Sequence, residues 1–209
     1  MKDPKLFLVS APSGAGKSSL IDAVLASAKQ SDLALELSIS YTTRSPRKGE
    51  SNGNQYFFIS EEDFINKKNS NFFLEYAEVH GNWYGTSVDF VESKLGSGIN
   101  LILEIDVQGF RQINELDIKY ESIFILPPSI YSLEERIKSR GDEDLEAINL
   151  RLKNAKDELA YANEYKHIII NDLFDDAERE LFKIIAQEKL PNREKTEEVQ
   201  QFLAQLLSY

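Results

Sequence analysis

Short apolar runs alternate along the chain with segments in which apolar residues recur every three or four positions. The opening run, Lys5–Ser10, predicts a buried strand followed by a glycine-rich turn. The next segment has apolar residues at helical spacing: Leu20, Ile21, Val24, Leu25 and Ala28. The pattern continues with strands at 101–105, 122–126 and 167–171 and helices at 87–95, 109–116 and 145–161. Ser129 is predicted to cap a further helix, which ends at a charged break at 140–144. Buried strands alternating with helices predict an α/β fold with a parallel sheet flanked by helices.

Residues 35–86 interrupt this rhythm with strands of half-polar character. The alternation over 35–41 predicts one strand with a polar face, 42–53 reads as a loop, 55–59 as a strand, and Ser60 as the cap of a short helix through Phe64. Phe72–Thr86 predicts two strands joined at a Gly-Asn turn. We therefore expect a core formed by 1–34 and 87–209, with an inserted, mainly β lobe at 35–86.

The C-terminal segment 194–207 predicts an amphipathic helix. Its apolar face is formed by Val199, Phe202, Leu203, Leu206 and Leu207. We favour packing of this face on the body of the domain, with a homo-oligomer contact as the alternative.

A phosphate-binding loop follows the first strand. Its residues are Ala11, Pro12, Ser13, Gly14, Ala15, Gly16, Lys17 and Ser18, which have Walker A spacing except that Ala11 replaces the usual first glycine. The two glycines allow successive backbone N–H groups to face one anion, and the helix that follows adds its positive end. Lys17 would reach the β- and γ-phosphates, and Ser18 would ligate Mg²⁺.

Asp106 ends the buried run 101–105, which is the Walker B arrangement of a metal-binding acid. The stretch Asp106-Val-Gln-Gly109 also matches the DxxG signature of GTPases. A GTPase would need an Asn-Lys-x-Asp tetrapeptide after a later strand. The chain has only Asn66-Lys-Lys-Asn69, in the wrong place and without the aspartate, so the sequence argues against a GTPase.

The composition excludes several kinds of partner and chemistry. The chain of 209 residues has 24 Lys and Arg against 35 Asp and Glu, and the net charge of −11 argues against a nucleic-acid partner. It has no cysteine, which excludes disulfides and thiolate chemistry, and no apolar stretch long enough to span a membrane. The sequence therefore predicts a cytoplasmic protein. Neither histidine, His80 or His167, stands in a catalytic context.

The stretch Ser38–Glu50 (SISYTTRSPRKGE), followed by Tyr56-Phe-Phe, Phe73–Glu78 and Tyr84-Gly-Thr86, closely resembles guanylate kinase, especially the bacterial enzymes. The resemblance runs from the phosphate-binding loop to about residue 172. It implies a P-loop kinase fold with an inserted GMP-binding lobe and a helical lid at about 129–160. It also implies transfer of phosphate from ATP to GMP, and to dGMP, with Mg²⁺ as cofactor.

The resemblance assigns the acceptor site residue by residue. Arg44 and Arg47, with Tyr56 and Tyr84, would clamp the GMP phosphate, and Glu50 would orient the arginines. The guanine would be contacted by Ser40, Glu75 and Thr86, and also by Glu104, where the family usually has aspartate. Independently of the resemblance, a carboxylate at Glu75 can accept from guanine N1–H and from the exocyclic amine, whereas adenine has no proton on N1.

The lid and the adenine side complete the expected site. Arg136, Arg140 and Arg151 match the arginines of the family's mobile lid, and Asn171 matches its adenine-side loop. With Lys17 and Arg44, the lid arginines form the predicted catalytic set, which stabilises charge on the transferring group. No general base is needed, because the GMP phosphate has a second pKa of about 6 and is largely a dianion at neutral pH.

Two alternatives remain at this point. One is a non-catalytic guanylate-kinase-like binding module, against which the intact Lys17, Ser18 and lid arginines argue. The other is a P-loop kinase that acts on a different small phosphorylated acceptor.

Overall fold

The computed structural model describes residues 3–79, 81–139, 145–188 and 196–208. The chain divides into two compact units, one formed by 1–8 and 34–120 and the other by 9–33 and 121–209. Its larger sheet is five-stranded, with the hydrogen-bonded order β2 (Leu35–Leu37), β7 (Asn100–Glu104), β1 (Leu6–Ser10), β8 (Tyr120–Leu126) and β9 (His167–Ile170). Strand β2 pairs parallel with β7, and β8 pairs parallel with β9. This is the predicted parallel α/β sheet. The predicted lobe, 35–86, lies inside the first unit, and its status as a separate insertion stays a prediction.

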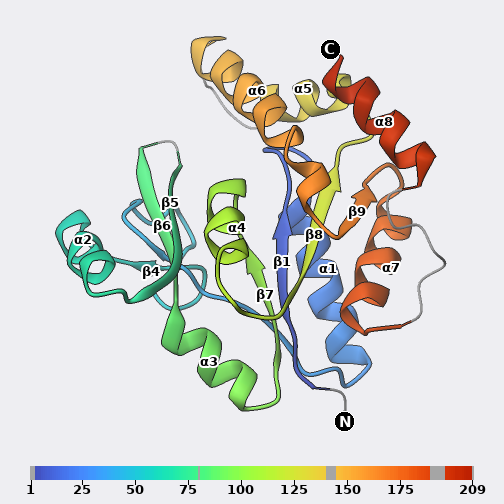
Figure 1. Ribbon diagram of the computed structural model, residues 1–209. Coiled ribbons are helices and arrows are strands. Elements are labelled where there is room, and N and C mark those ends of the chain that lie inside the picture. Colours follow the sequence, from blue (N-terminus) through green and yellow to red (C-terminus); the bar gives the residue numbers. More distant parts are fainter. Residues whose placement is uncertain (1–2, 80, 140–144, 189–195, 209) are drawn as a thin grey trace. The chain divides into compact units, whose positions relative to one another are not determined.

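The first unit contains the second, four-stranded sheet. Its strands are β4 (Phe57–Phe58), β3 (Tyr41–Thr42), β6 (Asn82–Ser87) and β5 (Phe73–Val79), in that order. The remaining elements are β2 (Leu35–Leu37), α2 (Glu61–Asn69), α3 (Val88–Gly96), β7 (Asn100–Glu104) and α4 (Val107–Asn114). Helix α4 packs beside β5, the last strand of the smaller sheet (Figure 1).

The second unit carries the phosphate-binding loop and most of the remaining helices. Its elements are the end of β1 (Leu6–Ser10), α1 (Lys17–Gln30), nearly all of β8 (Tyr120–Leu126), α5 (Ile130–Lys138), α6 (Leu145–Leu159), a 3₁₀ turn at Ala162–Glu164, β9 (His167–Ile170), α7 (Phe174–Ile185) and α8 (Glu197–Leu207). Helix α1 packs against α7, α5 against α6, and α6 against α8.

Burial follows the hydrophobic pattern closely. Every residue of β1 is buried, and so are the last five residues of β8. The predicted apolar face of α1 is buried through Leu20, Ile21, Val24 and Ala28. In α8, Leu203 and Leu206 are buried within the chain, which confirms the favoured packing of that helix, whereas Leu207 is exposed. None of the helices within the described ranges is long and apolar enough to cross a membrane.

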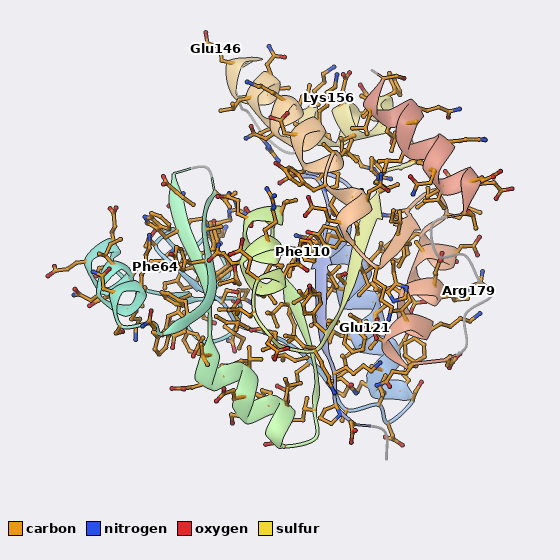
Figure 2. All side chains as sticks on the ribbon, in the orientation of Figure 1. Phe64, Phe110, Glu121, Glu146, Lys156 and Arg179 are labelled. Atoms are coloured by element: carbon orange, nitrogen blue, oxygen red, sulfur yellow. The ribbon has the colours of Figure 1, made fainter. Side chains whose placement is uncertain are left out.

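Aromatic residues form the core of the four-stranded sheet. Phe64 points from α2 toward the sheet (Figure 2), where its ring stacks on Phe73 at 4.4 Å and on Trp83 at 5.7 Å between centroids. Gly85 lies beneath these rings, and a Cβ there would meet Phe73 Cδ1 at 2.9 Å and Phe64 Cζ at 3.1 Å. The sheet therefore accepts only glycine at this position without moving its aromatic core.

The single strand predicted over 35–41 is wrong. The structure has β2 at Leu35–Leu37 in the larger sheet and β3 at Tyr41–Thr42 in the smaller one. Ser38 still donates its backbone N–H to Ile102 O at 2.8 Å, and the chain passes to the second sheet after that bond. Because both pieces are extended, the alternation of side chains continues through the break, so the pattern could not reveal it.

Helix boundaries differ from the prediction by a few residues. Helix α2 continues to Asn69 instead of ending at Phe64, and α4 begins at Val107. Ser60 and Ser129 are N-caps as predicted, since their hydroxyls accept from Asp63 N at 3.1 Å and Ser132 N at 3.0 Å. The predicted break at 140–144 lies outside the described residues.

Candidate active site

The phosphate-binding loop has the backbone geometry that its glycines predict. Gly14 and Gly16 have φ angles of 93° and 92°, in the left-handed region that other residues rarely adopt. Ala15 N donates to Pro12 O at 3.0 Å, which closes the turn. Helix α1 then begins at Lys17, and its N-cap, Gly16, makes no side-chain hydrogen bond. Lys17 and Ser18 therefore lie in the first turn, where backbone N–H groups and the helix dipole favour an anion.

Three side chains of the second unit contact the loop. Asn171, which is buried, donates from Nδ2 to Ala15 O at 2.7 Å. Arg136 Nη1 lies 3.5 Å from Gly14 O and 3.4 Å from Ala15 O. Arg151 Nη2 donates to Ser13 Oγ at 3.0 Å. The structure thus brings two of the predicted lid arginines and Asn171 to the loop, while the third, Arg140, lies outside the described residues.

These contacts explain why Gly14 and Gly16 must lack side chains. A Cβ on Gly16 would lie 2.5 Å from Asn171 Nδ2, and one on Gly14 would lie 3.2 Å from Ile137 Cγ1 and 3.3 Å from Leu133 Cδ1. Since the loop carbonyls bond to Asn171 and Arg136, the peptide units are held in one orientation. Such a preset orientation is what an array of N–H donors needs to bind phosphate without rearrangement.

Asn171 has a role at the loop that the sequence did not reveal. The resemblance places it on the adenine side of the site, and in the structure its amide also supports a carbonyl of the predicted phosphate-binding loop. A direct contact with ATP stays a prediction for this residue.

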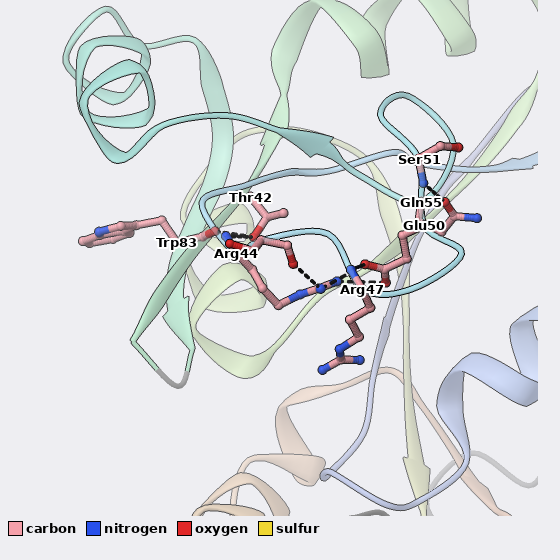
Figure 3. A network of polar contacts seen from close by, with 8 residues as sticks. Thr42, Arg44, Arg47, Glu50, Ser51, Gln55 and Trp83 are labelled. Atoms are coloured by element: carbon pink, nitrogen blue, oxygen red, sulfur yellow. Dashed lines mark hydrogen bonds and ion pairs between the residues drawn. The ribbon is translucent and has the colours of Figure 1, made fainter.

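In the first unit, Arg44 and Glu50 form a two-point ion pair, shown in Figure 3. Arg44 Nη1 donates to Glu50 Oε2 and Nη2 to Oε1, both at 2.9 Å, and Arg47 N donates to Glu50 Oε2 at 2.7 Å. The hydrogen bonds from Arg44 and then from Arg47 hold the pKa of Glu50 below its ordinary value. Glu50 therefore fixes both the Arg44 side chain and the backbone at Arg47, as expected for a residue that orients the clamp.

The Arg47 side chain extends away from this network, leaving its guanidinium apart from the Arg44–Glu50 pair (Figure 3). Arg44 is also held by the backbone, because its N–H donates to Thr42 Oγ1 at 3.1 Å and Nη1 donates to Ser45 O at 2.8 Å. Arg44 is thus held in place by several hydrogen bonds, and Arg47 projects from the same loop.

Two tyrosines lie beside this arginine. The rings of Tyr56 and Tyr84 meet edge to face at 5.8 Å, and Arg44 Cζ lies 5.4 Å from the centre of the Tyr56 ring. Burial, and after it the negative charge of Glu104, raises the pKa of Tyr56 to about 12. Tyr56 thus keeps its proton at neutral pH and remains a hydrogen-bond donor. The structure thus brings Arg44, Tyr56 and Tyr84 of the predicted clamp together with Glu50.

The three residues predicted to contact guanine form a continuous row across the smaller sheet. Strand β6 lies between β3 and β5, and its Thr86 pairs with Glu75 of β5. On the other edge of β6, Gly85 pairs with Tyr41, so the preceding residue, Ser40, comes opposite Thr86. Thr86 Oγ1 donates to Glu75 Oε1 at 2.6 Å and lies 3.5 Å from Ser40 Oγ. Strand pairing therefore collects residues that are 46 positions apart in the sequence.

Glu75 is a buried carboxyl with a shifted pKa. It is 4% exposed, and burial raises the pKa of its carboxyl to about 7, with Thr86 opposing and the Asp106 charge adding to the shift. A buried carboxyl whose pKa is shifted this far is a candidate for a functional group, because its charged form is kept close to neutral pH without exposure to water.

Asp106 caps helix α4. Its Oδ1 accepts from Gly109 N at 2.9 Å and its Oδ2 from Gln108 Nε2 at 3.0 Å. The sequence had indicated only a metal ligand, although an aspartate before a helix also signals an N-cap. No group of three or more acidic or histidine side chains suited to a metal occurs in the described ranges.

Gln112 is a structural residue of the site that sequence reasoning missed. Its Nε2 donates to Tyr76 O at 2.6 Å, and its Oε1 accepts from Tyr76 N at 3.2 Å. The side-chain amide thus bonds β5 as a neighbouring strand would, and it ties α4 to the strand that carries Glu75. A glutamine on a helix gives no sequence signal of such a contact.

Comparisons with known proteins agree with this geometry. The sequence model of the family described as guanylate kinase matches residues 3–188. A guanylate kinase of Hahella chejuensis is 48% identical over 186 residues, covering 89% of this chain and 88% of its own, and one of Mannheimia succiniciproducens is 46% identical over the full length of both. The crystal structure of a guanylate kinase from Anaplasma phagocytophilum aligns with a TM-score of 0.70 and 26% identity, covering 97% of this chain and 95% of that one.

Proposed function

Because the chain belongs to the guanylate kinase family, we propose that it transfers the terminal phosphoryl group of ATP to GMP, giving ADP and GDP. The observation that carries the proposal is the buried Glu75 carboxylate at the end of the Ser40–Thr86–Glu75 row, in the same compact unit as the Arg44–Glu50 pair. The two oxygens of the ionised Glu75 carboxylate suit the paired donors of guanine, and they repel N1 of adenine, which carries no proton. We extend the proposal to dGMP, because none of these residues is assigned to the ribose.

The acceptor phosphate is proposed to bind the second group of side chains. Arg44 and Arg47 supply charged donors, and Tyr56 and Tyr84 supply neutral ones. Because Glu50 already fixes Arg44, little conformational entropy is lost when that arginine meets the phosphate. Glu104 remains the proposed additional contact to the base.

The donor side is proposed to be the loop Ala11–Ser18. Its N–H groups and Lys17 would hold the β- and γ-phosphates, and Arg136, Arg140 and Arg151 would neutralise charge as the phosphoryl group moves. The GMP phosphate is already an anionic nucleophile, so catalysis consists of alignment and charge stabilisation. Exclusion of water would prevent hydrolysis of ATP in place of transfer.

We propose Mg²⁺ as the cofactor, with Ser18 and Asp106 as its protein ligands. Each Asp106 oxygen accepts one hydrogen bond and retains a second lone pair, so the carboxylate fits this role. Mg²⁺ in kinases commonly uses one or two protein ligands and completes its shell with phosphate oxygens and water, so a larger acidic cluster is not required. Bound there, the ion would neutralise phosphate charge.

Acidification should weaken GMP recognition. The pKa of Glu75 is raised to about 7, so the ionised form that accepts from guanine is lost as the pH falls below that value. We expect the KM for GMP to rise about tenfold per pH unit below pH 7, while it stays flat above pH 8. Steady-state kinetics from pH 5.5 to 8.5 measures this. The GMP phosphate also titrates in this range, so the Glu75→Gln variant provides the baseline, and equal pH slopes in both proteins would contradict the prediction.

A parallel substrate panel tests the function itself. ATP turnover should be measured with GMP, AMP, CMP, UMP and a sugar phosphate as acceptors, with and without EDTA. We expect turnover with GMP only, and its loss when EDTA removes the metal. A binding module would retain GMP without turnover, and a kinase for another acceptor would turn over a different compound.

The cellular context is proposed from the substrates. Free nucleotides are cytoplasmic metabolites, so we propose a cytoplasmic enzyme. A homo-oligomer formed through α8 is retained as a proposal because Leu207 on that helix is 46% exposed.

A further inference from the structure

The DxxG-like motif Asp106-Val-Gln-Gly109 ends in a glycine to which the proposed function gives no role. Gly109 lies inside helix α4, flanked on both sides by helical residues. Glycine is a poorer helix former than alanine, so its presence there calls for a packing reason. Its φ is not in the left-handed region, so backbone conformation does not require glycine at this position.

The packing reason is Glu75. If Gly109 carried a Cβ, the three nearest heavy atoms beyond the local helix would all belong to the Glu75 side chain. The Glu75 Oε2 atom would be closer than 3.0 Å, Cδ would be at 3.1 Å and Cγ at 3.5 Å. The Glu75 carboxylate therefore lies directly against the Cα of Gly109, in the space that a side chain would fill.

The backbone segments that carry Gly109 and Glu75 are held together, so neither can move away freely. Gln112 bonds both backbone groups of Tyr76 and holds α4 against β5, the strand that also carries Glu75. Gly109 N donates to Asp106 Oδ1, which fixes the start of the helix. An added methyl group must therefore displace the carboxylate end of Glu75, at the expense of its 2.6 Å bond from Thr86.

We infer that Gly109 is a positioning residue for guanine recognition: by lacking a side chain it leaves the space in which the Glu75 carboxylate is held for the base. The inference rests on the proposed function, in which Glu75 accepts from guanine. It gives the glycine of the DxxG-like motif a role in selecting the acceptor base, unrelated to a GTPase switch.

The test compares Gly109→Ala with Gly96→Ala, a matched control at the end of α3 where an added Cβ has no heavy atom within 4 Å. A displacement of about 1 Å at a reacting or recognition group can cost about 10²-fold, so we expect the KM for GMP to rise about 10- to 100-fold in Gly109→Ala. The KM for ATP and the melting temperature should stay at wild-type values. The preference for GMP over IMP, which lacks the exocyclic amine, should fall.

A double-mutant cycle tests the contact between Gly109 and Glu75. In a Glu75→Asp background the acid is one methylene shorter and is withdrawn from the added methyl group. Gly109→Ala should therefore raise the KM for GMP less than threefold there, because the effects of two residues in contact are coupled.

The inference is overturned if Gly109→Ala behaves like Gly96→Ala, if it impairs GMP and IMP equally, or if it unfolds the protein, since the fold should tolerate a methyl group opposed only by a flexible carboxylate. These results leave the proposed function intact as long as the wild-type chain phosphorylates GMP. A wild-type chain that does not would overturn the proposed function, and the inference with it.

Discussion

Replacing Lys17 with alanine should lower the kcat for GDP formation by at least about 10²- to 10³-fold, the usual cost of removing one preorganised donor to a developing charge. Lys17 is the first residue of α1, directly after the left-handed Gly16. The loop backbone is held by Asn171 and Arg136, neither of which depends on the lysine side chain. The loss should therefore fall on turnover far more than on folding, and it is measured by GDP formation at saturating ATP and GMP.

Lys29→Ala is the matched control for that experiment. Lys29 lies in the last turn of the same helix and is exposed, so its removal changes the net charge equally without touching the loop. Turnover of the control at the wild-type rate, with equal melting temperatures for both variants, would isolate the effect at the loop. A Lys17→Ala protein that makes GDP at the parental rate would refute the donor-site proposal.

Glu75→Gln should lower kcat/KM for GMP by at least about 10²-fold, since sites built on buried hydrogen bonds discriminate by up to about 10⁵ when one partner fails. The amide presents an N–H₂ group where guanine also presents donors, and Thr86 loses a charged acceptor. The KM for ATP should remain unchanged, because the substituted residue belongs to the proposed GMP site and not to the proposed ATP site. Initial rates with each substrate varied in turn give both constants.

Glu78→Gln controls for the chemistry of that change. Glu78 lies on the same strand, β5, but its side chain is exposed. It should leave kcat/KM for GMP within about twofold of wild type, as surface substitutions usually do. Equal losses in both variants would mean that the strand, and not the buried carboxylate, determines the effect.

The sequence predicted the parts of the fold that depend on local pattern. The buried strands β1, β7, β8 and β9 were visible because they are continuously apolar, and Ser60 and Ser129 were recognisable as caps because capping needs particular side chains at particular positions. The transfer of the chain between sheets at Ser38–Ser40 was not visible, because an extended chain keeps its alternation whichever neighbour it pairs with.

The candidate site divides in the same way. Gly14, Gly16 and Lys17 could be identified from spacing alone, since the phosphate loop is a local structure. The raised pKa of Glu75 could not, because it arises from burial and from Asp106, which lies thirty-one positions further along the chain. Contacts that depend on tertiary packing, such as Asn171 on the Ala15 carbonyl, leave no mark on the local pattern.

The bonds of Gln112 to Tyr76 have a consequence for solubility. Strand β5 is the terminal strand of its sheet, and an uncovered terminal strand can recruit an extended segment of another molecule and begin aggregation. At the middle of β5 both main-chain groups of Tyr76 are already bonded to a side-chain amide of the same molecule. The helix that helps to shape the acceptor site thus also protects this edge from intermolecular sheet extension.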